Sequence, residues 1–574
     1  MAISVKKRLF CAWHGSCLNN MHKTQYPIIS KGGYEMKLYQ NGVILTMNAA
    51  GERAGSMAVE GEHIVRVGDE EELAEEFPHA KKVDLRGRTV MPGFIEGHVH
   101  LLNYAYSLTK IDCAPLKSIE EMIEAGRKYI RERQVPAGKW VQGRGWNQIF
   151  FAEKRNPTTA DLDAISTEHP IVFTRVCEHM VVANSMALSM AGITKETENP
   201  EGGEIEHDEN GNLTGLLKET ARYLIYRMIP DKSVEEIKEM LVNAISIASS
   251  LGLTTMHTDD FETFSDKDWR KVMRAYRELE QEDRLNMRIR KQCLLPQIDR
   301  LKEFIKEEIL ERHDTSMVQA GPLKLLTDGS LGGRSAFLRA PYSDAPDTCG
   351  IAVFTKDELN ELVTTAHEAK MGVVCHAIGD GAMEMCMDAF LKAQEKRPDP
   401  DARFGIIHLQ ITQPDILKRF KEQNVIAYME PVCLNSDLHI AESRVGAERL
   451  PSTYNYRTLC DMNVMYTMSS DCPVDSLNPF DSLFVGVNRC DYSGYPEGGW
   501  MPEQKLTVEQ MLRGFTINGA YASFEENLKG SLEEGKLADF VILSQDPTRC
   551  DPMKLRDIAV EETVLGGRTV YRKK

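Results

Sequence analysis

The chain has 574 residues, of which 42% are hydrophobic and 27% are charged, as in an ordinary globular protein with a sizeable core. Its net charge of −17 disfavours nucleic acid and anionic membranes as partners, and no apolar run approaches the ~18 residues of a membrane-spanning helix. The 13 cysteines are scattered without a C-x-x-C motif, so we expect free thiols and a cytoplasmic protein.

Short strands are predicted at both ends of the chain. Residues 1–35 contain no segment suited to a secretory signal, and we expect a poorly ordered tail there. Residues 36–89 hold short alternating strands separated by turn sequences such as Asn41-Gly42, and residues 525–574 show the same pattern of short strands and turns. We therefore predict one composite β-sandwich domain, formed by both terminal regions around a middle region of residues 90–524.

In the middle region, strands alternate with amphipathic helices. Ser233 and Glu236 form a capping box before apolar residues at helical spacing, and Thr355 and Glu358 open another helix in the same way. Eight strand-like runs can be counted, at residues 90–100, 253–257, 288–293, 322–326, 372–376, 404–408, 425–429 and 464–468. This alternation predicts an α/β fold of the (β/α)8 type, a TIM-like barrel.

One segment breaks this rhythm. The first and second predicted strands are separated by far more residues than a normal βα connection contains. We interpret about residues 104–229 as an insertion after barrel strand 1, with short strands of its own. Because it follows the C-terminal end of that strand, it rises from the face that carries active sites in such barrels, and we expect that it can cover that face.

The first barrel strand ends in two histidines, in the sequence Met91-Pro-Gly-Phe-Ile-Glu-Gly-His98-Val-His100. Residues i and i+2 of a strand point to the same face, so His98 and His100 project together and can chelate a divalent metal. With 15 histidines in the chain, a His-x-His motif also arises by chance. The pair by itself therefore does not decide between a metal site and two unrelated buried histidines.

Other predicted strands also end in polar residues, namely Lys324, His376, His408 and Asp471. Each alone has a structural explanation, as a hydrogen-bonded core histidine, a solvated lysine or a helix cap. Their joint position instead predicts a metal site on the catalytic face of the barrel. Imidazoles hold Zn²⁺ or a similar ion that acidifies a bound water, and Asp471 can take the proton and pass it to a leaving nitrogen. Lys324 fits as a ligand only if CO₂ carbamylates it to a bridging carboxylate.

These residues and their neighbours resemble the amidohydrolase superfamily, specifically its YtcJ-like metal-dependent hydrolases (amidohydrolase family 3). The resemblance extends from Met36 to the C-terminus and is carried by residues 92–100, 143–146, 323–330, 376–380, 408, 470–474 and 530–543. It implies a TIM-like barrel, a β-sandwich of both termini, and one or two divalent ions, Zn²⁺ by expectation and two if Lys324 is carbamylated. It also implies a set of metal ligands, with Asp471 as ligand and catalytic base: His98, His100, Lys324, His376, His408 and Asp471. The glycine-rich sequence after Lys324 departs from the best-known members, so the resemblance implies no particular substrate.

A second group of residues is predicted to contact the substrate or to support the centre. Arg144 and Trp146, within a Gly-Arg-Gly-Trp sequence of the insertion, could clamp a carboxylate and stack on a ring, or could form a packed turn. His179 could donate a hydrogen bond to the substrate carbonyl, and Arg334 could bind an anionic group. Asp328 could orient Lys324 or a water from behind.

The leading hypothesis is hydrolysis of a C–N bond, of amide or N-acyl type, in a small-molecule substrate by metal-activated water. Within enzymes, the alternative is a mononuclear deaminase or cyclic-amide hydrolase with one metal on His98, His100, His376 and Asp471. An inactive barrel that serves binding or assembly is the alternative from another class, against which the complete ligand set argues. We expect no nucleic-acid or membrane partner, and homo-oligomerisation stays open.

Overall fold

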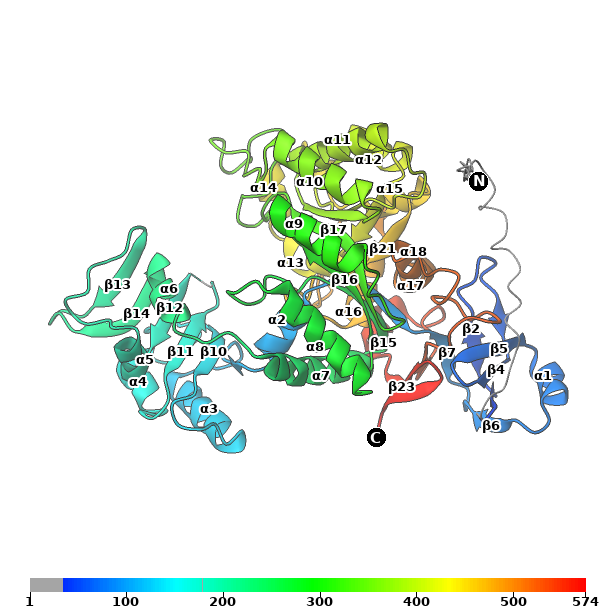
Figure 1. Cartoon of the computed structure of the whole chain (residues 1–574), viewed down its shortest axis with the longest axis horizontal. Coiled ribbons are helices and arrows are strands. Elements are labelled where there is room, and N and C mark those ends of the chain that lie inside the picture. The colour runs from blue at the N-terminus through cyan, green and yellow to red at the C-terminus, as the bar shows by residue number, and fades with distance from the viewer. Residues whose placement is uncertain (1–34, 178) are drawn as a thin grey trace, which may run out of the picture.

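The computed structural model describes residues 35–177 and 179–574. The predicted tail therefore lies, except for Glu35, outside the described residues. Figure 1 shows three bodies along the long axis of the chain, with the insertion on the left, the barrel in the middle and the sheets of the terminal regions on the right.

The middle body is built on one sheet of eight parallel strands. In their order around the sheet, these are β8 (Phe94–Val99), β15 (Leu253–Thr258), β16 (Arg288–Leu294), β17 (Val318–Leu326), β18 (Val373–Ala377), β19 (Gly405–His408), β20 (Ile426–Met429) and β21 (Tyr466–Met468). The segment after β21 returns to β8, because the amide of Asp471 donates to the carbonyl of His98 (3.0 Å) and the amide of His100 donates to the carbonyl of Cys472 (2.9 Å). The sheet is thus nearly closed, and the predicted barrel is confirmed.

Helices connect the strands and form one hydrophobic core with them. Both predicted capping boxes are present, at the start of α7 (Val234–Ser250) and of α10 (Lys356–Glu368). Further helices of this layer are α8 (Trp269–Gln281), α11 (Asp380–Lys396), α12 (Pro414–Glu422) and α16 (Pro479–Asn488). Every residue of β15 and β16 is buried, as expected for parallel strands covered on both faces. Among the described residues we find no helix with the length and apolarity of a bilayer-crossing segment.

Both termini contribute to the sheets at the right of Figure 1. A four-stranded sheet contains β5 (His63–Gly68), β4 (Ser56–Glu60), β1 (Lys37–Gln40) and β6 (Lys81–Asp84). A six-stranded sheet contains β24 (Arg568–Arg572), β23 (Val560–Leu565), β22 (Phe540–Leu543), β7 (Thr89–Pro92), β2 (Val43–Leu45) and β3 (Arg53–Ala54). Apolar residues of both sheets share a core, so the predicted β-sandwich of both terminal regions is confirmed.

The first predicted barrel strand is in fact two strands. Residues of β7 pair with β22 in the terminal sheet, whereas β8 pairs with β15 in the barrel. The chain changes sheets at Gly93, where a Cβ atom would lie 2.3 Å from the side chain of Thr254. The change therefore comes three residues later than the predicted boundary at residue 90, because this close crossing requires a glycine.

The insertion forms its own six-stranded sheet, as expected. Its strands in order are β13 (Gly203–His207), β14 (Leu213–Glu219), β12 (Met180–Ala183), β11 (Ile171–Arg175), β10 (Val141–Trp146) and β9 (Ile111–Asp112). Its helices are α3 (Ile119–Glu132), α4 (Thr159–Asp163), α5 (Ser185–Met190) and α6 (Tyr223–Tyr226). Figure 1 shows this body at the left, on the side of the barrel that lies opposite the terminal sheets and next to α2.

Candidate metal centre

The C-terminal ends of the barrel strands, here called the barrel mouth, bring together the six predicted ligands. His98 lies in β8 and His100 follows that strand, with their rings 5.0 Å apart. Oδ1 of Asp471, which follows β21, lies 3.4 Å from Nε2 of His98 and 3.1 Å from Nε2 of His100. Glu96 reinforces this junction, because its Oε1 accepts from the amides of His98 (3.2 Å) and Ser470 (2.9 Å). The backbone contacts that close the barrel therefore also assemble half of the centre.

The other three candidates come from β17, β18 and β19, which are neighbours in the sheet. His376 and His408 lie on adjacent strands with their rings 4.2 Å apart, and the ring of His408 is 6.0 Å from that of His98. His376 pairs in register with Leu326, so Lys324 starts two residues deeper in the barrel. Its long side chain makes up this difference and places Nζ 3.2 Å from Nε2 of His98.

Each of the four imidazoles has a partner at Nδ1, which leaves Nε2 available for a metal. The partners are Gln292 Oε1 for His98 (2.5 Å), the carbonyl of Asp259 for His100 (3.2 Å), Asp328 Oδ1 for His376 (3.0 Å) and Glu430 Oε2 for His408 (2.5 Å). Such contacts fix the orientation and tautomer of the ring, as is typical of metal-binding histidines.

Three of these partners, Gln292, Asp259 and Glu430, are absent from the set predicted above. Glu430 directly follows the buried strand β20, and Asp259 directly follows β15, which is the same signal that points to His376 and His408. Asp328 was expected to support Lys324 or a water. It instead holds His376 and accepts from the amides of Phe337 (3.0 Å), Ile378 (3.1 Å) and Gly379 (2.8 Å).

Two of the candidate ligands have a left-handed backbone. His408 has φ 78° and Asp471 has φ 55°, a region that non-glycine residues seldom adopt. Both residues stand where a strand ends and the chain turns away from the barrel. Such conformations persist where the surroundings hold them in place, and they cluster at functional sites.

The carboxylate and the imidazoles of the centre shift each other's pKa values. Burial acts to lower the pKa of His100, but the close contact with the negatively charged Asp471 outweighs it and raises this pKa to about 8. Burial acts to raise the pKa of Asp471, but contacts with His100 and His98 hold it well below its ordinary value. Burial, followed by the charge of Lys324, lowers the pKa of His98 to about 3. At neutral pH the centre therefore contains an ionised carboxylate beside a neutral His98.

The chemistry of this set fits a divalent metal. The ligand atoms of His98, His100 and Asp471 lie within 4.8 Å of one another, and so do those of His408, Glu430 and Asp471. Asp471 belongs to both groups. Its Oδ1 is buried without a hydrogen-bond partner in the described part of the chain, although two imidazole nitrogens lie close to it. A buried orphan oxygen among imidazoles fits a cation such as Zn²⁺.

Three of the predicted substrate contacts have structural roles instead. Trp146 is fully buried in the core of the insertion, and its Nε1 donates to a backbone carbonyl (3.1 Å). His179 is exposed on the insertion and contacts Glu219 through Nδ1 (2.9 Å). Arg334 makes a two-pronged ion pair with Asp344 (3.0 and 2.8 Å). These contacts account for the three side chains without a substrate.

The bulge in β10 explains why Trp146 and Arg144 do not act together. Two residues apart on a regular strand, they would share a face. The register of β10 against β11 shifts between them, and Gly145 adopts φ 89° at this point. Trp146 therefore turns into the core of the insertion, whereas Arg144 stays half-buried near the barrel, close enough to Cys472 for its charge to act on that thiol.

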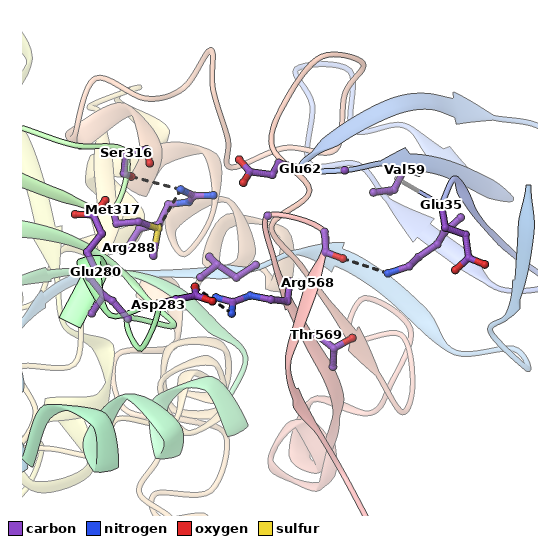
Figure 2. A pocket seen from close by; sticks show the side chains of 16 residues that line it. Glu35, Val59, Glu62, Glu280, Asp283, Arg288, Ser316, Met317, Arg568 and Thr569 are labelled. Carbon is purple, nitrogen blue, oxygen red and sulfur yellow. Dashed lines mark hydrogen bonds and ion pairs between the residues drawn. The ribbon is translucent and has the colours of Figure 1, made fainter. Parts of the chain in front are cut away.

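A cavity of about 670 Å³ lies at the opposite end of the barrel, where the terminal sheets meet the first residues of the strands (Figure 2). Its cationic residues are engaged with the protein itself. Lys37 contacts a backbone carbonyl (3.3 Å), Arg288 pairs with Asp539 (2.6 Å) and Arg568 pairs with Asp283 (3.4 Å). None of the six candidate ligands lines this cavity, and we interpret it as the junction between the two bodies.

Comparisons with known proteins agree over most of the chain. The amidohydrolase family matches residues 81–571. The protein YtcJ of Bacillus subtilis (strain 168) is 31% identical over 541 residues, which cover 93% of this chain and 99% of that protein. An N-substituted formamide deformylase of Arthrobacter pascens is 26% identical over 558 residues, covering 93% and 98% of the two chains. A crystal structure of an uncharacterized metal-dependent hydrolase from Pyrococcus furiosus shares 29% identity and a TM-score of 0.74, over 90% of this chain and 100% of that chain.

Proposed function

Because the chain belongs to the amidohydrolase family, we propose that it hydrolyses an amide or N-acyl bond of a small molecule with the help of a bound divalent metal. Membership in this family makes it a hydrolase of carbon–nitrogen bonds, as the sequence predicted. The observation that carries the proposal is the meeting of four imidazoles, Lys324 and Asp471 at the barrel mouth. The name of the Arthrobacter relative, a deformylase of N-substituted formamides, supports the N-acyl class of bond.

The residues proposed to hold the metal are His98, His100, Lys324, His376, His408 and Asp471. When bound there, Zn²⁺ or a similar ion supplies an acidified water and polarises the substrate carbonyl. Three of the donors, His100, His376 and Asp471, are partly exposed, at 22%, 16% and 15% of their side chains, so the centre is open to substrate from the barrel mouth.

Asp471 is the proposed proton carrier. Its contacts with His100 and His98 outweigh the effect of burial and keep its pKa well below the ordinary value. The carboxyl group is therefore ionised at neutral pH and has an oxygen available to accept a proton. In the reaction it takes a proton from the attacking water and delivers it to the leaving nitrogen as the carbon–nitrogen bond breaks. Water thereby supplies the hydroxyl of the acid product and a proton of the amine product.

Lys324 is the proposed bridge between two ions. Reaction with CO₂ requires a neutral amine, and complete burial lowers the pKa of this lysine. Among the described residues its Nζ contacts only Nε2 of His98, and no carboxylate lies at ion-pair distance to keep it protonated. These features support a carbamylated lysine and therefore two metals.

The first experiment is elemental analysis of the purified protein together with turnover of N-formyl amines, N-acyl amines, cyclic amides and amino-substituted heterocycles. We expect two equivalents of divalent metal and hydrolysis of linear amides. One equivalent with ring opening or deamination would support the mononuclear alternative, and the absence of both metal and turnover would support a binding or assembly module. We also propose a cytoplasmic location, which the free thiols of all described cysteines support.

The variant Asp471→Asn tests the proton carrier. It keeps an oxygen ligand but loses the basic carboxylate, so we expect retained metal and a kcat lower by about 10²- to 10⁴-fold. Asp347→Asn is the control, because Asp347 is an exposed carboxylate on the segment after β17. Wild-type turnover by the Asp471 variant would rule out this role for Asp471.

A further inference from the structure

We propose that Arg144 binds a carboxylate of the substrate, so that the enzyme prefers amides that carry an acidic group. This inference rests on the proposed function and adds the class of substrate to it.

The face of β10 that carries Arg144 is turned toward the barrel. Gly143 faces the core of the insertion, where an added Cβ would lie 2.8 Å from the ring of Phe173. Gln142 and Arg144 are the neighbours of Gly143 in the strand, so their side chains lie on the opposite face of the sheet, where both are half-buried. Gln142 accepts a hydrogen bond from the hydroxyl of Tyr106 (3.1 Å), which belongs to α2 (Leu101–Ser107), the helix that starts directly after His100.

The guanidinium of Arg144 makes no hydrogen bond and no ion pair with any residue that the structure describes. The neighbouring arginine of the sheet is different, because Arg175 lies over the ring of Trp146 and donates to Gln148 (2.9 Å). A guanidinium has five N–H donors and stays charged, so a half-buried one without acceptors is costly unless a ligand supplies them. In a chain of net charge −17, an unpaired cation at this place is available for an anion.

Arg144 lies near the segment that carries the proposed proton carrier. Its charge acts on the thiol of Cys472, the residue that follows Asp471. Tyr104 also interacts electrostatically with Cys472, and it is held one turn after His100 by its amide, which donates to the His100 carbonyl (2.8 Å). The side chain of Tyr104 likewise has no hydrogen-bond partner among the described residues. Two donors from separate elements, neither of which has a hydrogen-bond partner among the described residues, thus lie near the segment that carries the proposed catalytic carboxylate.

The geometry of a guanidinium favours a carboxylate as the ligand. The planar fork of its N–H groups matches two carboxylate oxygens, and the phenol of Tyr104 can donate a third hydrogen bond. A substrate held in this way would have its amide over Asp471 and its acidic group directed toward the insertion. The insertion would then act in substrate selection.

The test compares two amides that differ only in the carboxylate, N-acetyl-phenylalanine and N-acetyl-phenethylamine. Binding to the metal-loaded protein is measured by calorimetry, and kcat/KM is measured in parallel. We expect the wild type to prefer the acidic amide, and Arg144→Leu to raise the Kd of that amide about 10- to 100-fold while the Kd of the neutral amide stays within about twofold. Tyr104→Phe should give a smaller loss in the same direction.

Arg133→Leu is the matched control, since Arg133 belongs to the same insertion but lies over the ring of Tyr129 (5.1 Å). This change should affect neither amide, and Arg144→Lys should recover part of the lost affinity because it restores the charge without the fork. Equal losses for both amides in Arg144→Leu, or a wild type without preference for the acidic amide, would overturn the proposal. Selective binding without hydrolysis would instead refute the hydrolase proposal and leave the role of Arg144 intact.

Discussion

At the scale of single residues, each imidazole of the candidate metal centre is held in place by a hydrogen-bond partner at its Nδ1, on the side away from the metal position. Glu430 shows the principle, because its carboxylate contacts Nδ1 of His408 (2.5 Å) and also accepts from the hydroxyl of Ser469 (3.3 Å). A buried imidazole that loses such a partner is free to rotate away from the metal. The outer residues are therefore expected to matter for metal affinity almost as much as the ligands.

Glu430→Ala should weaken metal binding about 10- to 100-fold without unfolding the barrel. The reason is that Nδ1 of His408 would lose its partner, whereas the six candidate ligands would all remain. Competition with a chelator of known affinity measures the change. Glu422→Ala is a suitable control, because Glu422 pairs with Lys418 on the outer surface of α12 (3.2 Å). Equal affinities of the Glu430 variant and the wild type would show that His408 needs no such support.

Metal affinity should also depend on pH through His100. The contact with Asp471 outweighs burial and raises the pKa of His100 to about 8, so its imidazole carries a proton below that pH and must lose it to bind a cation. Apparent affinity should therefore fall about tenfold for each pH unit below 8 and level off above it. His98, whose pKa burial and Lys324 lower to about 3, adds nothing to this slope. Titration of the metal-free protein with Zn²⁺ between pH 6 and 9 measures this pH dependence of the affinity. An affinity that does not change with pH would contradict the proposed role of His100 as a ligand.

At the scale of elements, the insertion is stabilised separately from the barrel. The residues around Trp146 form a hydrophobic cluster of their own, apart from the large cluster that joins the barrel strands and helices. The bulge at Gly145 turns Trp146 into this cluster and leaves Arg144 outside it. The same strand thus supplies a core anchor and the proposed substrate contact.

Trp146→Ala should destabilise the insertion by about 3–5 kcal/mol, because it empties a fully buried aromatic site and removes a hydrogen bond to a backbone carbonyl. Hydrogen exchange should accelerate in β10 and β11, while the barrel strands keep their protection. Trp146→Phe should cost less, because it fills most of the volume. Uniform loss of protection across both bodies would mean that insertion and barrel unfold as one unit.

At the scale of the whole molecule, buried ion pairs join the barrel to the terminal sheets. Arg288, the first residue of β16, pairs with Asp539 through two contacts (2.6 and 3.0 Å), and Arg290 of the same strand pairs with Glu525 (2.5 Å). These residues lie at the end of the barrel away from the metal centre. The two buried pairs thus connect the barrel strand β16 to the C-terminal part of the chain.

Asp539→Ala should therefore cost about 3–5 kcal/mol, because it leaves the buried guanidinium of Arg288 without its partner. Urea unfolding measures the change. The double variant Arg288→Met with Asp539→Leu serves as control and should be much less destabilised, since it removes both charges and keeps apolar volume. If the single variant were as stable as the double one, the pair would have no role in joining the two bodies.

Much of the fold could be predicted because the sequence of each strand shows by its own apolar residues that the strand is buried. Apolar runs with polar ends marked the barrel strands, and capping boxes at Ser233 and Thr355 marked two helices. The boundary at residue 90 was three residues early, because Val90 and Met91 are as apolar as the barrel strand that follows and are distinguished by the pairing of their strand with β22 and β2. The insertion was predicted as a body, but its position beside the barrel depends on contacts that no local pattern contains.

For the candidate metal centre, the sequence by itself determined which polar residues stand at the ends of the barrel strands. Strand periodicity places His98 and His100 on one face, and parallel strands align the ends that carry Lys324, His376, His408 and Asp471. Tertiary structure alone decided what stands behind them, since His98 meets Gln292 across 194 positions of the chain. It also decided that Arg334 is paired and Trp146 is buried, while Arg144 has no hydrogen-bond or ion-pair partner among the described residues. The physical reason is that a side chain's direction follows from its own strand, whereas its acceptors arrive from whichever distant segments pack against it.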